Sequence, residues 1–265
     1  MTGARMHLLT TLRGDIARIE TSGGASTPDR VALGHAEADA TLRGGLARGA
    51  IHEVFAEAGR HSAAATGFVA GLARRVAARR PLLWVRQDFS DIETGALSMS
   101  GWAELGLDPC LLVTVRAADL DTALRTAADA LACDALGAVV LDVWGRSRQL
   151  DLVASRKLTL AAQASGVTGL LLRVAAEPAP STAETRWIVR AAHAPPPSAG
   201  SAWGAPVFEA QLVRNRHGPV GRWIMEWKCD ECLFAKPVNQ PTSDPQPVAA
   251  APVHRPHPAR ARRAG

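Results

Sequence analysis

Residues 49–65 read GAIHEVFAEAGRHSAAA. The stretch begins with a short apolar strand, Ile51 to Phe55, passes through a turn, and starts a helix at Ser62. A strand, a turn and a helix in this order are the setting in which nucleotide-binding proteins place a phosphate loop, Gly-x4-Gly-Lys-Ser/Thr. The stretch therefore predicts the frame of a phosphate site and an α/β fold built around it.

The chemistry of that loop is missing. Gly59 is its one glycine, Arg60, His61 and Ser62 follow, there is no lysine, and Ala63 stands where a metal-binding hydroxyl would sit. The lysine and the hydroxyl are the groups that neutralise charge during phosphoryl transfer. We therefore expect no enzyme activity and no cofactor. Backbone N–H groups at a helix start still attract anions, so weak binding of ATP with magnesium stays open.

The middle of the chain alternates strands with helices. Several of the strands are apolar on both faces, which is typical of a mostly parallel sheet that is covered by helices on both sides. After Ser181 the expected strands follow one another without helices, which indicates an antiparallel extension. The expected strands are 51–55, 82–85, 111–115, 138–143, 169–174, 185–192, 207–214 and 222–227, and the expected helices are 62–79, 120–131 and 157–164.

Both ends of the chain differ from this core. His7 to Glu20 has apolar residues at helical spacing and is followed by a linker, TSGGASTPD. From Lys236 onwards, seven of 30 residues are proline and few are bulky and apolar, so we expect this segment to be disordered. The predicted organisation is an N-terminal helix and linker (1–29), one α/β domain (30–235) and a Pro/Arg-rich tail (236–265).

The positive charge lies in the tail. The tail has five cations, among them Arg260, Arg262 and Arg263, and one acidic residue, Asp244, so its net charge is +4. The whole chain carries +5, and the first 235 residues therefore carry about +1. A basic tail can contact DNA through phosphates, and the plain alternative is a solubilising end. We see no apolar run that predicts a membrane helix and no secretory signal, so we expect a cytoplasmic protein without a membrane partner.

Two aspartates follow or end predicted strands. Asp142 ends the apolar strand AVVLD and could hold magnesium in an intact site; the alternative, which we favour, is that it caps the turn before Trp144. Asp88 follows the strand LLWVRQ and could activate a water, but its neighbours Asp91 and Glu93 favour an ordinary acidic loop.

A predicted hairpin carries the other candidate residues. Arg214, Asn215, Arg216 and His217 stand before a Gly/Pro turn that joins two strands. Cations at a hairpin tip can reach a phosphate of DNA or of a neighbouring subunit. The alternative is a charged surface turn.

The cysteines and tryptophans suggest structural roles. Cys110 and Cys133 have apolar neighbours and are expected in the core. Cys229 and Cys232 form half of a zinc site without a second Cys/His pair at conventional spacing, so we predict no metal site and read them as surface thiols, with their role left open. Trp223 and Trp227 face one side of their strand and are expected in the core rather than stacked on bases.

These segments together resemble the RecA-like fold and, within it, the inducible-mutagenesis protein A (ImuA) family. The resemblance spans about residues 30 to 228. It is carried by VALGHAEADATLRGGLARGAIHEVF (31–55), by SMSGWAELGLDPCLLVTVRAADLDTALRTAADAL (98–131) with GAVVLDVWG (137–145), and by RNRHGPVGRWIMEW (214–227). Each motif is weak by itself, whereas their order and spacing are fairly specific.

The resemblance implies roles for some positions. His61-Ser62-Ala63 stands at the Gly-Lys-Thr of the loop, Asp88 at the position of the catalytic glutamate, and Asp142 at that of the magnesium aspartate. Arg214 and Arg216 match a Lys/Arg-x-Arg finger that reaches the nucleotide of a neighbouring subunit.

The resemblance also implies a function. It suggests a non-hydrolysing adaptor in SOS-induced, error-prone translesion synthesis. The expected partners are an ImuB-like polymerase homologue and an error-prone DNA polymerase, with RecA and single-stranded DNA as further candidates. The alternatives are an ATP-dependent DNA-binding ATPase with an atypical loop and, more distantly, a SulA-like cell-division inhibitor.

Overall fold

The computed structural model describes residues 29–194 and 204–237. The elements in chain order are β1 (Arg30–Val31), α2 (Ala36–Thr41), β2 (Leu46–Ala47), β3 (Ile51–Ala56), η1 (Gly59–His61), α3 (Ser62–Ala77), β4 (Leu82–Gln87), α4 (Asp88–Thr94), α5 (Met99–Glu104), η2 (Pro109–Leu111), β5 (Leu112–Ala117), α6 (Leu120–Leu131), β6 (Ala138–Trp144), α7 (Leu152–Ser165), β7 (Thr168–Val174), β8 (Thr185–Ala191), β9 (Val207–Asn215), β10 (Gly221–Lys228) and β11 (Leu233–Ala235).

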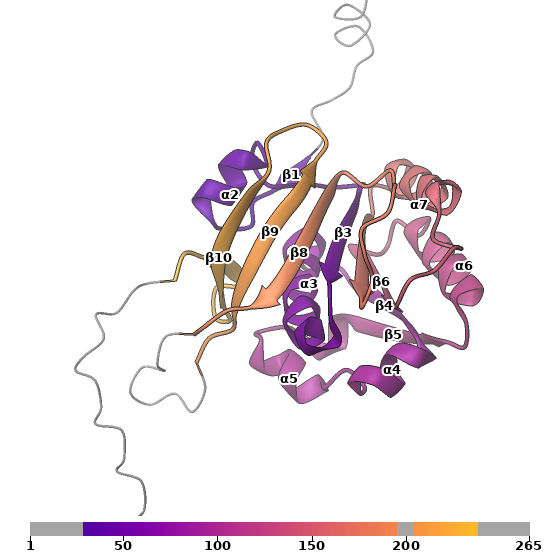
Figure 1. Ribbon diagram of the computed structural model, residues 1–265, viewed down its shortest axis with the longest axis horizontal. Helices are drawn as coiled ribbons and strands as arrows, with labels where there is room; N and C mark the ends of the chain where they lie inside the picture. Colours follow the sequence, from indigo (N-terminus) through magenta and orange to yellow (C-terminus); the bar gives the residue numbers. More distant parts are fainter. Residues whose placement is uncertain (1–28, 195–203, 238–265) are drawn as a thin grey trace, which may run out of the picture.

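One nine-stranded sheet organises the molecule, in the order β11-β10-β9-β8-β3-β7-β6-β4-β5 (Figure 1). The strands from β8 to β5 in this order run parallel, and β9, β10 and β11 continue the sheet antiparallel. The predicted α/β fold with a mostly parallel sheet and an antiparallel C-terminal extension is confirmed. In detail, β8 pairs parallel with β3, so the extension begins one strand later than the sequence pattern suggested.

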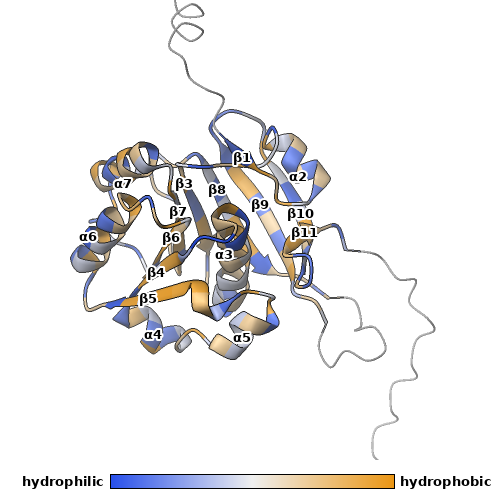
Figure 2. Ribbon diagram, turned by 180° about the vertical axis from the view of Figure 1, so that it is seen from behind, coloured by the Kyte–Doolittle hydropathy of each residue, from blue (hydrophilic) through white to orange (hydrophobic). Residues whose placement is uncertain are grey.

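Helices cover both faces of the parallel part. On one face α3 packs over the sheet, and its apolar side contacts Trp187 of β8 and Phe208 of β9, with Trp227 of β10 in the same core. On the other face α6 and α7 form a smaller core with β6 and β7. Figure 2 shows α3 crossing the sheet on the side opposite to that seen in Figure 1. The strands thus bury both faces, as their unbroken apolar runs require.

Three expectations about local structure need correction. α7 begins at Leu152, five residues before the predicted start, because Asp151 caps it by accepting a hydrogen bond from the backbone N–H of Ala154 (2.8 Å). Asp88 opens a short helix, α4, rather than an acidic loop. Cys110 and Cys133 are exposed and do not belong to the core, since neither lies on the buried face of an element.

Other expectations hold or lie outside the described residues. Trp227 is fully buried and Trp223 packs against the same core, so their structural role is confirmed. No helix of the described part combines the length and apolarity needed to cross a bilayer. The predicted N-terminal helix of residues 7–20 and the tail with Arg260, Arg262 and Arg263 lie outside the described residues.

Candidate functional site

The loop after β3 is tight and leads directly into α3. Gly59, Arg60 and His61 form a 3-10 turn, and the backbone N–H of His61 donates to the carbonyl oxygen of Ala58 (3.0 Å). That N–H is therefore already used inside the loop. Ser62 is the first residue of α3, and no side chain caps the helix start. The uncapped N–H groups keep some attraction for an anion.

The side chain of Trp144, the last residue of β6, packs against the loop after β3. A Cβ atom on Gly59 would lie only 3.0 Å from the Trp144 ring. The ring therefore packs on the backbone of the loop at the position where a phosphate loop needs glycine for the close approach of its ligand. Trp144 ends β6 and lies two residues beyond Asp142, so both side chains point to the face of the sheet that α3 covers.

Asp142 is bound to a cation of the chain itself. It lies inside β6, only 2% exposed, level with Arg86 of the neighbouring β4. The Nε atom of Arg86 is 3.0 Å from Asp142 Oδ2, and the indole N–H of Trp84 donates to the same oxygen (3.4 Å). The interpretation of Asp142 as a turn cap is therefore wrong, because its carboxylate pairs across buried strands. Its negative charge is balanced by a guanidinium.

Burial dominates the ionisation of Asp142. Removal from water raises the pKa of its carboxyl group to about 6, while Arg86, Trp84 and Ser90 act in the opposite direction. A carboxylate that is costly to ionise and already paired is a poor ligand for a second cation. The arrangement fits a structural ion pair better than a magnesium site.

The ion pairs continue outward from Asp142 to the edge of the sheet. Arg86 Nη1 is 2.9 Å from Asp91 Oδ1 in α4, and Arg116 Nε of β5 lies 3.2 Å from Asp91 Oδ2 and 3.0 Å from Asp88 Oδ1. We call these five residues, Asp142, Arg86, Asp91, Arg116 and Asp88, the ion-pair chain. Asp88 thus pairs with the edge strand β5, and two strands, β7 and β6, lie between β4 and the strand that carries the loop.

The hairpin tip lies at the opposite end of the sheet. Asn215 of β9 pairs with Thr185 of β8, which pairs with His52 near the start of β3, whereas the loop follows the end of β3. The six residues of β3 therefore separate the tip from the loop by roughly 20 Å. Figure 1 shows the tip beside α2 and β1 at this amino end of the parallel strands.

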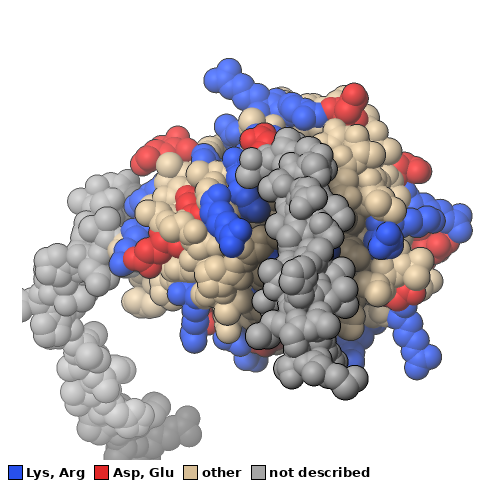
Figure 3. Space-filling view, turned by 90° about the horizontal axis from the view of Figure 1, so that it is seen from above, with Lys and Arg blue, Asp and Glu red and all other residues tan. Residues whose placement is uncertain are grey.

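The four tip residues differ in how freely they can contact a partner. Arg214 is half-buried and donates to the carbonyl oxygen of Ser181 (2.8 Å), and Asn215 donates to that of Thr41 (3.2 Å). Arg216 and His217 are exposed; Arg216 donates to the carbonyl oxygen of Thr182 (3.4 Å), and His217 Nε2 lies 3.4 Å from Glu184 Oε2. On the face that holds the tip, basic and acidic side chains are interspersed (Figure 3). The structure therefore leaves Arg216 and His217 as the accessible pair.

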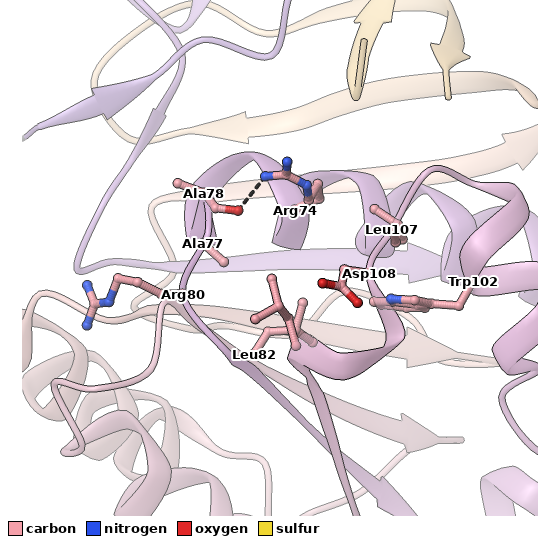
Figure 4. Close-up of a pocket in the computed structure, with 9 residues that line it drawn as sticks. Arg74, Ala77, Ala78, Arg80, Leu82, Trp102, Leu107 and Asp108 are labelled. Carbon is pink, nitrogen blue, oxygen red and sulfur yellow. Dashed lines mark hydrogen bonds between the residues drawn. The ribbon is translucent and has the colours of Figure 1, made fainter. Parts of the chain in front are cut away.

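A small pocket lies away from all of these residues. It is formed at the C-terminal end of α3 with α5 and η2, and Leu82, Trp102 and Leu107 line it together with Arg74, Arg80 and Asp108 (Figure 4). The indole N–H of Trp102 is buried there without an acceptor among the described residues. The loop Gly59–Ser62 is at the other end of α3, so this pocket belongs to a different place in the fold.

The sequence pattern missed Arg86 and Trp144. The one signal for Arg86 is a cation inside an otherwise apolar strand, and its partner becomes evident only once β4 is known to lie beside β6.

A second buried ion pair, Arg186 Nε to Glu53 Oε2 at 2.7 Å, lies on the other face of the sheet, where Arg173 and Arg186 both contact the ring of Phe55. Burial lowers the pKa of Arg173.

Comparisons with known proteins show that the chain is similar to curated proteins named ImuA. The chain is 29% identical over 197 residues to "Protein ImuA" of Caulobacter vibrioides strain NA1000 / CB15N, which covers 69% of this chain and 77% of the relative. The same values hold for "Protein ImuA" of strain ATCC 19089 / CIP 103742 / CB 15. No family model matches the chain. The likeness supports the ImuA-family resemblance found in residues 30 to 228.

Proposed function

We propose that this chain is a non-hydrolysing, RecA-like accessory protein of DNA-damage-induced, error-prone translesion synthesis. Its similarity to Protein ImuA supports the role in damage-induced mutagenesis. The observation that carries the non-hydrolysing part is the pairing of Asp142 with Arg86. A guanidinium of the chain balances the carboxylate that would otherwise hold magnesium.

The loop supports the same proposal. Hydrolysis of a nucleoside triphosphate needs cations at the transferred phosphoryl group and a held metal ion. The loop offers Arg60, His61 and Ser62 without a lysine, and Trp144 packs on Gly59. A chain of this kind acts by binding. Its partners would be an ImuB-like polymerase homologue and an error-prone polymerase, with RecA and single-stranded DNA as further candidates.

We assign the partner contact to the hairpin tip. Arg216 and His217 are exposed at the amino end of the sheet, on the side away from the loop. A finger that reaches a nucleotide on a neighbouring RecA-type protein needs an accessible cation. Arg216 is exposed and makes a long hydrogen bond to the carbonyl oxygen of Thr182 (3.4 Å), whereas Arg214 is half-buried and donates to that of Ser181 (2.8 Å). The tip can therefore serve a neighbour although the chain's own loop is degenerate.

A binding experiment with the purified full chain tests this assignment. We expect Arg216→Glu to weaken binding to the ImuB-like polymerase homologue at least tenfold, since charge reversal at an interface replaces attraction by repulsion. Arg79→Glu, an exposed arginine at the end of α3, is the matched control and should bind as the parent does. Equal binding by both variants would refute the assignment of the tip. Failure of the parent chain to bind either polymerase would refute the adaptor role.

The second candidate function is an ATP-dependent DNA-binding ATPase with an atypical loop. The observation in its favour is the uncapped start of α3 beside the exposed Arg60, which together can attract a phosphate. DNA-stimulated turnover that Asp142→Asn or Asp88→Asn abolishes would establish it. The third candidate, a division inhibitor, rests on the family resemblance alone.

A further inference from the structure

Strand β7 carries a buried cation near its carboxyl end, and this cation lacks an ionic partner among the described residues. Arg173 is 5% exposed, and no carboxylate oxygen of residues 29–194 or 204–237 lies within 4.0 Å of its guanidinium nitrogens. Its Nε–H is buried without an acceptor in this part of the chain, and Nη2 donates to the carbonyl oxygen of Gly145 (3.3 Å). Burying a charge without a partner is costly, so an anion at this place would stabilise the fold.

The lack of a carboxylate distinguishes Arg173 from the other buried arginines. The described part of the chain buries three arginines, Arg86, Arg173 and Arg186. Arg86 Nε lies 3.0 Å from Asp142 Oδ2, and Arg186 Nε lies 2.7 Å from Glu53 Oε2. On both faces of the sheet, then, the chain stabilises a buried guanidinium with a carboxylate. The comparison indicates that a carboxylate is what Arg173 lacks.

The charges around Arg173 do not balance. The guanidinium carbons of Arg173 and Arg186 lie 5.7 and 5.6 Å from the centre of the Phe55 ring. The ring attracts both cations, but sharing it brings two like charges close together. Glu53 supplies one negative charge and is paired with Arg186. Two cations and one carboxylate leave one positive charge, which a single monoanion would balance.

A ligand can approach this cation from the carboxyl end of β6 and β7, the end at which open α/β sheets bind ligands. Gly145 directly follows β6, and a Cβ added to it would meet no atom beyond its chain neighbours within 4 Å, so the space beside it is open. Arg146 and Glu177 join the loops after the two strands, with side chains 80% and 75% exposed and 3.5 Å apart. A pair this exposed contributes little stability and can separate when a ligand arrives.

We propose that Arg173 binds a carboxylate group, which a ligand brings to the carboxyl end of β6 and β7. The planar guanidinium offers Nε–H and a neighbouring Nη–H as a fork that fits the two oxygens of a carboxylate. One carboxylate also supplies the single negative charge that the cluster lacks. A phosphate dianion or the polyphosphate of a nucleotide would leave excess negative charge in a buried place. The inference does not depend on the proposed role in mutagenesis.

A titration of the purified full chain with sodium acetate, at constant ionic strength, tests the proposal. Nuclear magnetic resonance of isotope-labelled arginine follows the Nε–H of Arg173, which its absence from Arg173→Met identifies. We expect this resonance to move saturably, with half-saturation at about millimolar acetate and at least about tenfold more chloride or inorganic phosphate needed for the same shift. Arg148→Met, which removes an exposed arginine from the loop after β6, is the matched control and should leave the response unchanged.

Urea unfolding provides a second readout. Without acetate, we expect Arg173→Met to unfold at the same or a higher urea concentration than the parent, because it removes an unpaired buried charge. Arg186→Met should unfold at a lower concentration, since it leaves Glu53 without its cation. Acetate should raise the midpoint of the parent and leave that of Arg173→Met unchanged. This readout needs only that Arg173→Met folds, and the removal of an unpaired charge favours folding.

A blocked tripeptide with a central glutamate distinguishes the two sources of the carboxylate. Half-saturation at a lower concentration of this peptide than of acetate would assign the group to an acidic side chain of a protein partner. Tighter binding of acetate would assign it to a small molecule. Three results would overturn the proposal. The first is an Nε–H resonance that stays unmoved up to about 100 mM acetate. The second is an equal loss of response in Arg148→Met and Arg173→Met. The third is a lower urea midpoint for Arg173→Met than for the parent without acetate, because its guanidinium would then already be paired within the chain.

Discussion

Arg86 holds two carboxylates, and this makes it the residue on which the ion-pair chain depends. Its side chain is 7% exposed and lies between Asp142 and Asp91. Removing one partner of a buried ion pair leaves the other charge uncompensated in a medium of low polarity. A buried pair of this kind contributes little net stability by itself, but breaking it on one side is costly.

We predict that Arg86→Met lowers the free energy of unfolding by about 3–5 kcal/mol at pH 7. The loss should be smaller at pH 5, because a protonated Asp142 no longer needs a cation. Arg116→Met, which removes an arginine whose side chain is 66% exposed, should cost less than about 1 kcal/mol. Urea unfolding at both pH values measures the effect. Equal losses for the two variants would contradict the central role of Arg86.

His52 predicts a pH dependence of stability. It is fully buried between Thr185 Oγ1 (2.8 Å) and the carbonyl oxygen of Ala47 (2.9 Å), and burial lowers its pKa to about 4. Below pH 6.5 the unfolded chain therefore binds a proton that the folded chain rejects. Stability falls as the pH falls from 6.5 to 4, by up to about 3 kcal/mol.

Asp142 acts in the opposite direction, so the test needs a difference measurement. Its folded pKa of about 6 lies above the unfolded value of 3.8, and its contribution to stability is lost as the pH rises through that window. Comparing the parent with His52→Gln cancels this term. We expect the stability advantage of the parent over the variant to shrink between pH 7.5 and pH 4.5. An advantage that stays constant over this range would refute the assignment to His52.

Helix α3 carries two glycines one turn apart that should respond oppositely to alanine. A Cβ at Gly67 would lie 3.5 Å from the Phe208 ring, which is an ordinary contact, whereas one at Gly71 would lie 2.7 Å from the Phe234 ring and 3.0 Å from the Trp227 ring. Alanine is favoured over glycine inside a helix by about 1 kcal/mol.

We therefore expect Gly67→Ala to raise the free energy of unfolding by about 0.5–1 kcal/mol. Gly71→Ala should lower it by about 1–3 kcal/mol, because the methyl group overpacks the aromatic core under β10 and β11. Thermal and urea unfolding of the two variants side by side provide the measurement. If both substitutions stabilised the chain, the packing of α3 on β10 and β11 described here would be wrong.

The elements differ in how well the sequence predicts them. The parallel strands are unbroken apolar runs, so their positions follow from composition, and most of their bounds lie within one or two residues of the predicted ones. α4 (DFSDIET) has no apolar period; it follows the carboxyl end of β4 and leaves Phe89 and Ile92 exposed. β11 is a strand only because β10 pairs with it. Such elements depend on tertiary contacts that no local pattern reports.

The residues of the candidate site also differ in how well the sequence predicts them. The loop residues from Gly59 to Ser62 could be predicted because a strand, a turn and a helix surround them, and Asp142 because it stands near a strand end. The partner of Asp142 could not be predicted, since Arg86 lies 56 positions earlier in the chain and meets it only through the strand order β6-β4.

At the scale of the whole molecule, the sheet separates two regions with different chemistry. The carboxyl end of the parallel strands holds the tight loop and the ion-pair chain, in which two arginines pair with three aspartates. The amino end holds the hairpin tip with the exposed Arg216 and His217. This separation fits a protein that uses one end of a nucleotide-binding frame as a rigid support and presents the other end to partners.

The most direct measurement is calorimetric titration of the purified full chain with ATP and magnesium, with and without single-stranded DNA. The account predicts no saturable binding up to millimolar nucleotide, because Arg86 balances Asp142 and the loop lacks its lysine. Saturable binding in the micromolar range, accompanied by DNA-stimulated hydrolysis that Asp142→Asn abolishes, would contradict it and replace the adaptor by an ATPase.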